Sequence, residues 1–316
     1  MLTGTPLENR LLDLWSLLTF ATPGALGDRA YFQKHFDRRK DDRAAERLSA
    51  RLRPFILRRT KGQVARELPP RTEENMLCEL TGLQEKLYRE QLAQAQHMIL
   101  TSTGAEMLNK RRFAILQAIT RLRQICCHPA LVQPGADDEE SAKLNALMEL
   151  LDQLHDEGHK VLVFSQFVAM LKIIRDKLTG LNRPFHWLTG ASQNRADIVK
   201  SFQETPDPSV FLLSLKAGGS GLNLTAASYV ILYDPWWNPA VENQAIDRAH
   251  RIGQTQPVMA YRLLAKNSIE EKIRHLQQQK SLLSSDVLGE ENFARSLDQQ
   301  DLEYLFDIGE RRGDDE

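Results

Sequence analysis

Apolar positions in the second half of the chain follow two alternating spacings. Short apolar runs predict β-strands at residues 161–164, 183–188, 210–213, 229–233 and 258–264. Apolar residues recur at helical spacing before the first of these strands, at residues 144–154, and between later ones, at residues 170–178 and 195–202. Strands that alternate with helices predict an α/β domain, in which helices cover both faces of a parallel sheet.

Helical spacing also dominates the flanking regions. Residues 7–18 and the long stretch 84–128 carry apolar residues at helical intervals. A further helix is expected at residues 268–283, where Ser268 and Glu271 fit a capping box. Residues 132–141 contain a Pro-Gly pair and four consecutive acidic residues, so this segment is expected to be a linker.

Charge is distributed unevenly along the chain. The formal net charge is −1, but residues 29–66 contain 13 Lys or Arg against four acids, a local charge of +9. Residues 286–316 contain 11 acids against three bases, a local charge of −8. The basic block suits contact with phosphate, although most of its residues taken singly suit a solvated helix face equally well. The acidic end is expected to be a frayed tail.

Composition narrows the class of protein. A chain of 316 residues suits about two domains. It contains no apolar run of membrane-spanning length and no signal peptide pattern, which predicts a soluble intracellular protein without a membrane partner. Cys78, Cys126 and Cys127 are too few for a disulfide framework, and adjacent cysteines lack the spacing of zinc ligands.

Residues 244–254 are the first candidate for chemistry. At helical spacing, Gln244, Asp247, Arg248 and Arg251 fall on one face of an expected helix. Guanidinium groups bind phosphate bidentately, so this face suits a polyanion. The alternative is a solvated helix in which Asp247 pairs with Arg251.

A glycine-rich loop precedes this segment. The expected strand at residues 210–213 leads into a polar loop that contains Ser214, Lys216, Gly219 and Gly221. Such loops let backbone N–H groups approach phosphate closely. The next expected strand ends in the turn Asp-Pro-Trp-Trp-Asn-Pro at residues 234–239.

In this order, residues 210–254 resemble motifs V and VI of Swi/Snf-type ATPases, the double-stranded-DNA translocases of helicase superfamily two. Three other segments extend the resemblance: residues 2–9 resemble motif III, residues 57–61 and 68–70 the linker out of the first RecA-like lobe, and residues 160–167 motif IV. The resemblance implies five regions: residues 1–70, the end of the first RecA-like lobe with a basic exit; 71–131, a helical insertion; 132–141, a linker; 142–266, the second RecA-like lobe; and 267–316, a helix bracing lobe one with an acidic tail.

The resemblance also implies roles for individual residues. Arg248 and Arg251 correspond to paired arginine fingers, and the expected nucleotide contacts are Gly219, Gly221, Gln244 and Asp247. The expected DNA contacts are Ser165, Gln166, Arg195, Ser214, Lys216, Trp237, Thr3 and Thr5. Plainer interpretations stay open: a tight turn for the glycines, a ring buried against the sheet for Trp237, a helix N-terminal arginine for Arg195, and a hydroxyl-rich turn for Thr3 and Thr5.

The sequence departs from the family pattern by lacking two motifs. It contains neither the phosphate loop G-x-x-x-x-G-K-[ST] nor Asp-Glu-x-His, which hold the phosphates and magnesium of ATP. We therefore expect the C-terminal part of a longer protein, inactive alone, in which the first lobe holds Mg²⁺ and ATP binds between the lobes. The expected partners are double-stranded DNA, bound independently of sequence, and an unknown DNA-bound protein.

Two alternatives of function stay open, a strand-separating helicase and a non-catalytic nucleic-acid-binding lobe. The expected location is the nucleoid of the cytoplasm in a bacterium or the nucleus in a eukaryote.

Overall fold

The computed structural model describes residues 11–37, 42–56, 65, 67–80, 82–101, 105–218, 221–283, 297 and 299–308. The predicted site residues Thr3, Thr5 and Gly219 lie outside these ranges, as does the predicted motif III. Lys216 is described for its backbone only.

A six-stranded sheet forms the centre of the molecule, with strand order β1-β6-β5-β2-β4-β3 and every neighbouring pair parallel. The strands are β1 (Arg71–Cys78), β2 (Val161–Ser165), β3 (Phe185–Leu188), β4 (Val210–Ser214), β5 (Tyr229–Leu232) and β6 (Val258–Ala265). All five predicted strands are present, and the predicted RecA-like parallel α/β architecture is confirmed.

Strand β1 corrects the prediction for the start of the helical insertion. It pairs along its whole length with β6, from Arg71 opposite Val258 to Cys78 opposite Ala265. Most of its residues are exposed because it lies at the edge of the sheet. A polar edge strand lacks the apolar run of a buried one, which is why the sequence pattern did not reveal it.

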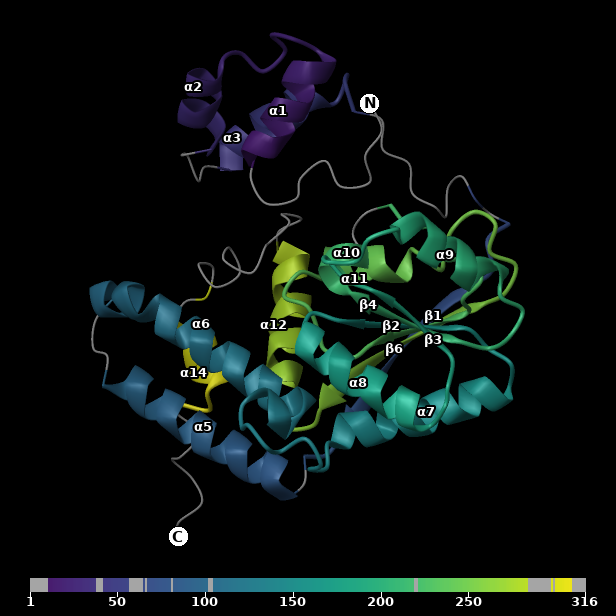
Figure 1. The fold of residues 1–316 in the computed structure, drawn as a ribbon. Coiled ribbons are helices and arrows are strands. Elements are labelled where there is room, and N and C mark those ends of the chain that lie inside the picture. Colours follow the sequence, from purple (N-terminus) through teal and green to yellow (C-terminus); the bar gives the residue numbers. More distant parts are fainter. Residues whose placement is uncertain are drawn as a thin grey trace.

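Helices cover the two faces of the sheet (Figure 1). One face carries α7 (Ala142–Asp156) and α8 (Val168–Gly180), and its core includes Val161 and Val163. The opposite face carries α9 (Arg195–Glu204), α10 (Leu215–Gly218) and α11 (Pro239–Ile246). Leu162 and Phe164 belong to the core of that face, as expected from the alternation of side chains along a strand.

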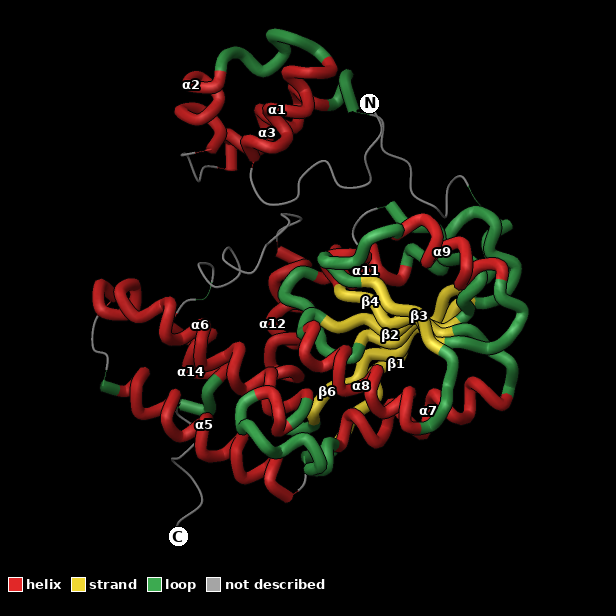
Figure 2. The backbone as a smooth tube through the Cα atoms, in the orientation of Figure 1, coloured by secondary structure: helices red, strands yellow, loops and turns green. Residues whose placement is uncertain are grey.

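A helical region projects beside the sheet (Figure 2). Its long antiparallel pair is α5 (Gly82–Leu100) and α6 (Ala105–Cys127), followed by the short η2 (Pro129–Leu131). Helices α12 (Ile269–Leu283) and α14 (Gln299–Leu305) pack against this pair and share one core with it. In the described part of the chain, the main contacts of α12 are with α6, α14 and β6, so α12 braces the helical region. The predicted contact of this helix with lobe one stays a prediction.

The amino-terminal helices have a core of their own. Helices α1 (Leu11–Ala21), α2 (Arg29–Phe32), η1 (Gln33–Asp37) and α3 (Asp42–Leu52) bury Leu14, Phe32, Phe36 and Leu48 among one another. The predicted helix at residues 7–18 is therefore present from Leu11 onward, within the described residues.

Candidate functional site

The segment that contains both candidate arginines is not the continuous helix that was predicted. Helix α11 begins after the N-cap residue Asn238, with Pro239 in the first turn, and ends at Ile246. Residues 247–254, here called the arginine segment, form a series of turns. The Arg248 carbonyl accepts a hydrogen bond from the Leu224 N–H at 2.9 Å, and the buried Gln254 amide donates to the Ala249 carbonyl at 3.2 Å. The first bond ties the segment to a loop distant in sequence, and within the segment the helical spacing ends with the bond from the His250 N–H to the Ile246 carbonyl at 3.1 Å.

Arg251 lies against the glycine loop. Its Nη1 donates to the carbonyl oxygens of Gly221 at 3.3 Å and Leu222 at 3.4 Å, and its side chain is exposed. Gly221 has φ +64°, a conformation that favours glycine, and a Cβ built there would meet no atom within 4 Å. The structure thus brings the predicted motif V loop and Arg251 together, beside open space.

Arg248 lies deeper than Arg251 and is 7% exposed. Burial lowers the pKa of its guanidinium, the positive charge of Arg251 lowers that pKa further, and Asp247 acts in the opposite direction. The positive charge of Arg251 therefore destabilises the charged form of Arg248. A bound polyanion would relieve this repulsion, so the pair is suited electrostatically to phosphate.

Asp247 pairs with Arg71 instead of with Arg251. The Arg71 Nη1 lies 3.3 Å from Asp247 Oδ1, and the Arg71 Nη2 donates to Asn243 Oδ1 at 2.6 Å. The predicted alternative of an Asp247–Arg251 pair is therefore wrong, because Arg251 no longer lies one helical turn from Asp247. No local sequence signal could identify Arg71, which is distant in sequence and lies at the start of an edge strand.

A buried carboxylate, which the sequence did not single out, anchors α11. Glu242 accepts hydrogen bonds from the Trp236 N–H at 2.8 Å and from Arg262 Nε at 2.8 Å, and Arg274 Nη1 lies 3.6 Å away. Arg262 also bridges to Glu73 on β1. This network ties α11 to β1, β6 and α12. No local pattern in the sequence marks Glu242 as its centre.

The carboxyl end of β2 is arranged around a buried aspartate. Ser165 is fully buried and donates its hydroxyl proton to Asp234, whose second oxygen accepts the Gln166 N–H at 3.1 Å. Burial raises the pKa of Asp234 above its ordinary value, against the opposing charge of Arg123. The Ser165 hydroxyl is committed to this bond, so the predicted DNA contact by Ser165 would require the bond to break.

Trp237 is a buried ring. It is 1% exposed and belongs to the core of the helical region, and the Arg123 guanidinium lies over it at 4.7 Å from the ring centroid. Gln277 on α12 donates to the Trp237 carbonyl at 2.8 Å. The interpretation of Trp237 as a packing residue therefore describes this conformation, although the ring packs against the helical region and not against the sheet. A buried ring cannot make the predicted DNA contact in this conformation.

The other predicted contacts lie on separate elements. Ser214 is buried at the end of β4, where its hydroxyl accepts the Ala217 N–H at 3.3 Å. Arg195, the first residue of α9, donates to the carbonyls of Gly190 at 3.1 Å and Ser192 at 3.4 Å. Gln244 is half-exposed on α11. The structure therefore brings Gly221, Arg248 and Arg251 together, and it places Ser165 opposite Ser214 on neighbouring strands.

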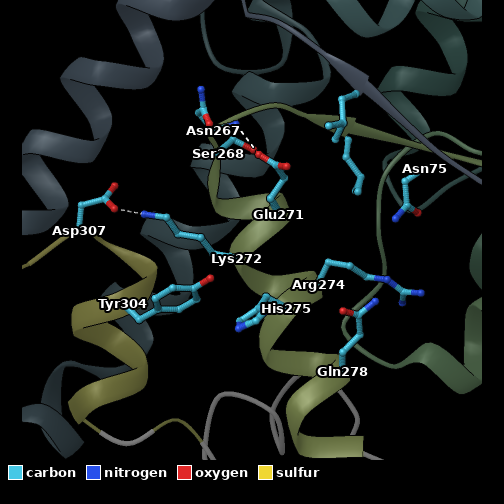
Figure 3. A pocket seen from close by; sticks show the side chains of 12 residues that line it. Asn75, Asn267, Ser268, Glu271, Lys272, Arg274, His275, Gln278, Tyr304 and Asp307 are labelled. Carbon is cyan, nitrogen blue, oxygen red and sulfur yellow. Dashed lines mark hydrogen bonds and ion pairs between the residues drawn. The ribbon is translucent and has the colours of Figure 1, made fainter. Parts of the chain in front are cut away.

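A separate open hollow of about 800 Å³ lies between the edge of the sheet and helices α12 and α14 (Figure 3). Asn75 faces it from β1, Arg274 and His275 from α12, and Tyr304 from α14, and the Lys272–Asp307 ion pair closes one side. Among the predicted site residues whose side chains the structure describes, none lines this hollow. Within the described ranges, no group of three or more His, Cys, Asp or Glu residues could hold a metal ion.

None of the helices in the described part of the chain is both long enough and apolar enough to cross a membrane.

A parallel sheet covered on both faces, with an arginine pair beside a glycine loop, defines a RecA-like helicase lobe. Comparison with known proteins identifies the family. Residues 1–131 match the model of the SNF2-related domain, and residues 142–253 match the helicase conserved C-terminal domain. The Sulfolobus solfataricus SWI2/SNF2 ATPase C-terminal domain is 34% identical, with a TM-score of 0.61 over 75% of this chain and 99% of that one. The chain belongs to the SWI2/SNF2 family of ATPases.

Longer relatives give the same result. The Sulfolobus solfataricus SWI2/SNF2 ATPase core in complex with double-stranded DNA is 37% identical, with a TM-score of 0.64 over 96% of this chain and 65% of that one. An uncharacterized ATP-dependent helicase of Mycoplasma genitalium is 41% identical over 97% of this chain. The chain spans 29% to 34% of the length of three curated relatives that it matches.

Proposed function

We propose that this chain supplies the second motor lobe of a DNA-dependent ATPase that translocates on double-stranded DNA and remodels DNA-bound protein complexes. The observation that carries the proposal is the placement of Arg251 against Gly221, with Arg248 so close that the charge of Arg251 lowers the pKa of Arg248. Family membership and the duplex-bound solved relative support the same function.

In this proposal, Arg248 and Arg251 act on the phosphates of ATP. ATP supplies the γ-phosphoryl group, with accompanying Mg²⁺ bound by residues outside this chain. The planar guanidinium of Arg251 neutralises charge that develops on that group, a contribution on the order of a thousandfold or more in turnover. Arg248 holds a second positive charge behind it, and Gly221 keeps the space beside the pair open. Gln244 would contact the nucleotide from the same face of the sheet.

The proposed DNA contacts are with the phosphate backbone, through residues that include Lys216, Gln166 and the basic block at residues 29–66. Phosphate contacts carry no base information, so binding is expected to be indifferent to sequence. Remodelling would follow from movement of this lobe along the duplex during each cycle, without obligatory strand separation.

The first prediction tests the finger role of Arg251 in the full-length protein. Arg251→Lys retains a positive charge but loses the planar fork that matches phosphate. DNA-stimulated turnover should fall on the order of a thousandfold. The KM for ATP should change much less than kcat, because the interaction forms mainly in the transition state. Steady-state kinetics, a duplex-binding titration and thermal unfolding are the measurements.

Arg183→Lys is the matched control, because Arg183 forms a surface pair with Asp152 at 2.9 Å. Neither residue belongs to the glycine loop or the arginine segment. Lysine should preserve that pair, and turnover should stay at the wild-type level. Near-normal hydrolysis by Arg251→Lys would refute the finger role. Unwinding of a bare duplex by the wild type would favour the strand-separating alternative.

A further inference from the structure

The exit of the inter-lobe linker is attached directly to the arginine segment. This linker exit, residues 68–71, follows the basic block and leads into β1. His250 Nε2 lies 2.8 Å from the Pro69 carbonyl oxygen, and the Arg71 guanidinium bonds to Asp247 and Asn243. Residues more than 170 positions apart in the sequence are thus joined at two points.

The linker exit is a stiff support for these bonds. Proline fixes its own φ, and the residue before a proline is restricted to extended conformations, so the consecutive Pro69 and Pro70 leave the chain little freedom. The Pro70 carbonyl accepts the Val258 N–H at 3.0 Å, and Arg71 pairs opposite Val258 in the sheet. The Pro69 carbonyl therefore has a position fixed by the sheet itself.

The arginine segment needs such support. It lies beyond the end of α11 and consists of turns. The last backbone bond of helical spacing joins the His250 N–H to the Ile246 carbonyl at 3.1 Å, so the helical ladder does not reach Arg251. Asp247 immediately precedes Arg248, and His250 immediately precedes Arg251. Each candidate finger thus directly follows a residue that is attached to the linker exit.

We propose that His250 and Arg71 are positioning residues that hold Arg248 and Arg251 in their reactive orientation by fastening the arginine segment to the linker exit. This inference rests on the proposed finger function. It adds that the end of the inter-lobe linker, held in place where it joins the sheet, sets the orientation of the fingers.

The test compares two substitutions at one position in the full-length protein. His250→Gln keeps an N–H donor close to the position of Nε2, whereas His250→Met has a similar volume and no donor. A misplacement of a catalytic group by about 1 Å can lower the rate on the order of a hundredfold, so His250→Met should lower DNA-stimulated kcat by at least about tenfold. His250→Gln should restore most of that loss.

Other quantities separate positioning from a general structural role. The KM for ATP, the affinity for duplex DNA and the midpoint of thermal unfolding should be nearly the same for the two variants. Arg71→Met should lower kcat as His250→Met does, and Arg71→Lys should recover part of it. His155→Met on α7, at a half-buried position on the opposite face of the sheet, is the control and should leave kcat unchanged.

Equal kcat values for His250→Met, His250→Gln and wild type would overturn the inference, as would equal losses in both variants. Arg251→Lys in the same assays keeps this result separate from the proposed function. If Arg251→Lys is inactive while His250→Met is fully active, only the positioning role fails. If Arg251→Lys is active, the finger function fails first.

Discussion

At the scale of single residues, the feature with the largest cost of desolvation is an ion pair whose two side chains are both completely buried. Lys143 on α7 lies 2.5 Å from Glu270 on α12, and both side chains are completely buried. Burial alone would lower the pKa of Lys143, but the carboxylate of Glu270 raises it above its ordinary value. Lys143 also donates to the Tyr233 carbonyl at 3.2 Å, and Glu270 accepts the Ala265 N–H at 2.9 Å. The pair therefore joins the sheet to the helical region.

We predict that breaking this pair on one side is far more costly than removing both charges. Lys143→Met should lower the free energy of unfolding by about 3–5 kcal/mol, because it leaves a buried carboxylate without its cation. The double variant Lys143→Met with Glu270→Gln should recover a large part, since glutamine is neutral and can still accept the Ala265 N–H. Urea unfolding followed by circular dichroism measures both. Additive effects of the two single substitutions would contradict this account.

At the scale of elements, helix ends show where local signals suffice. The predicted capping box of α12 is present in a shifted form: the Ser268 hydroxyl accepts the Glu270 N–H at 3.1 Å, and the Glu271 carboxylate accepts the N–H of Asn267. Ser268 also donates to the Ala265 carbonyl at 2.6 Å. The end of α11 has no such local signal: beyond Ile246, the Arg248 carbonyl accepts the Leu224 N–H from a loop distant in sequence.

Ser268→Ala should therefore destabilise the protein by about 1–2 kcal/mol, because it removes both the cap and the partner of a buried carbonyl. Gln279→Ala, at an exposed position of the same helix, is the control and should change stability by less than about 0.5 kcal/mol. Both follow from equilibrium unfolding of the purified chain. A Ser268→Ala variant as stable as the control would show that packing of α12 alone fixes its start.

At the scale of the whole molecule, binding and hydrolysis should separate. The chain has a basic block and the proposed arginine fingers, but its sequence contains no phosphate loop. We predict that the purified chain binds unrelated duplexes with similar affinity, and that this affinity falls steeply with salt as counterions are released. We predict no DNA-stimulated ATP hydrolysis by the chain alone, with activity in the full-length protein.

Binding titrations over a salt series measure the affinity for duplex DNA, and a phosphate-release assay measures ATP hydrolysis. Turnover by the chain alone that disappears in Arg251→Ala would contradict the second part. Affinity that depends strongly on sequence and weakly on salt would contradict the first.

The sequence by itself determined the architecture and the family. Buried strands such as 161–164 and 210–213 are continuous apolar runs, and helices between them have an apolar stripe, because each must cover a face of the sheet. The glycine loop, the Asp-Pro-Trp-Trp turn and the arginines then identified the family before any contact was known. These signals are local, since each depends on residues that are close together in the chain.

Only the tertiary structure decided how the site is built. The contacts of three residues, Arg71, Glu242 and His250, depend on distant partners or on burial. Neither a distant partner nor burial can be inferred from the spacing of residues in the sequence. The same holds for Trp237, where a buried ring and an exposed one have the same sequence pattern. The end of α11 is the clearest case. Helical spacing of the side chains continues to Arg251 in the sequence, but the helix ends at Ile246, the Arg248 carbonyl bonds to Leu224 of a loop more than 20 residues away, and the Arg251 guanidinium lies beside Gly221.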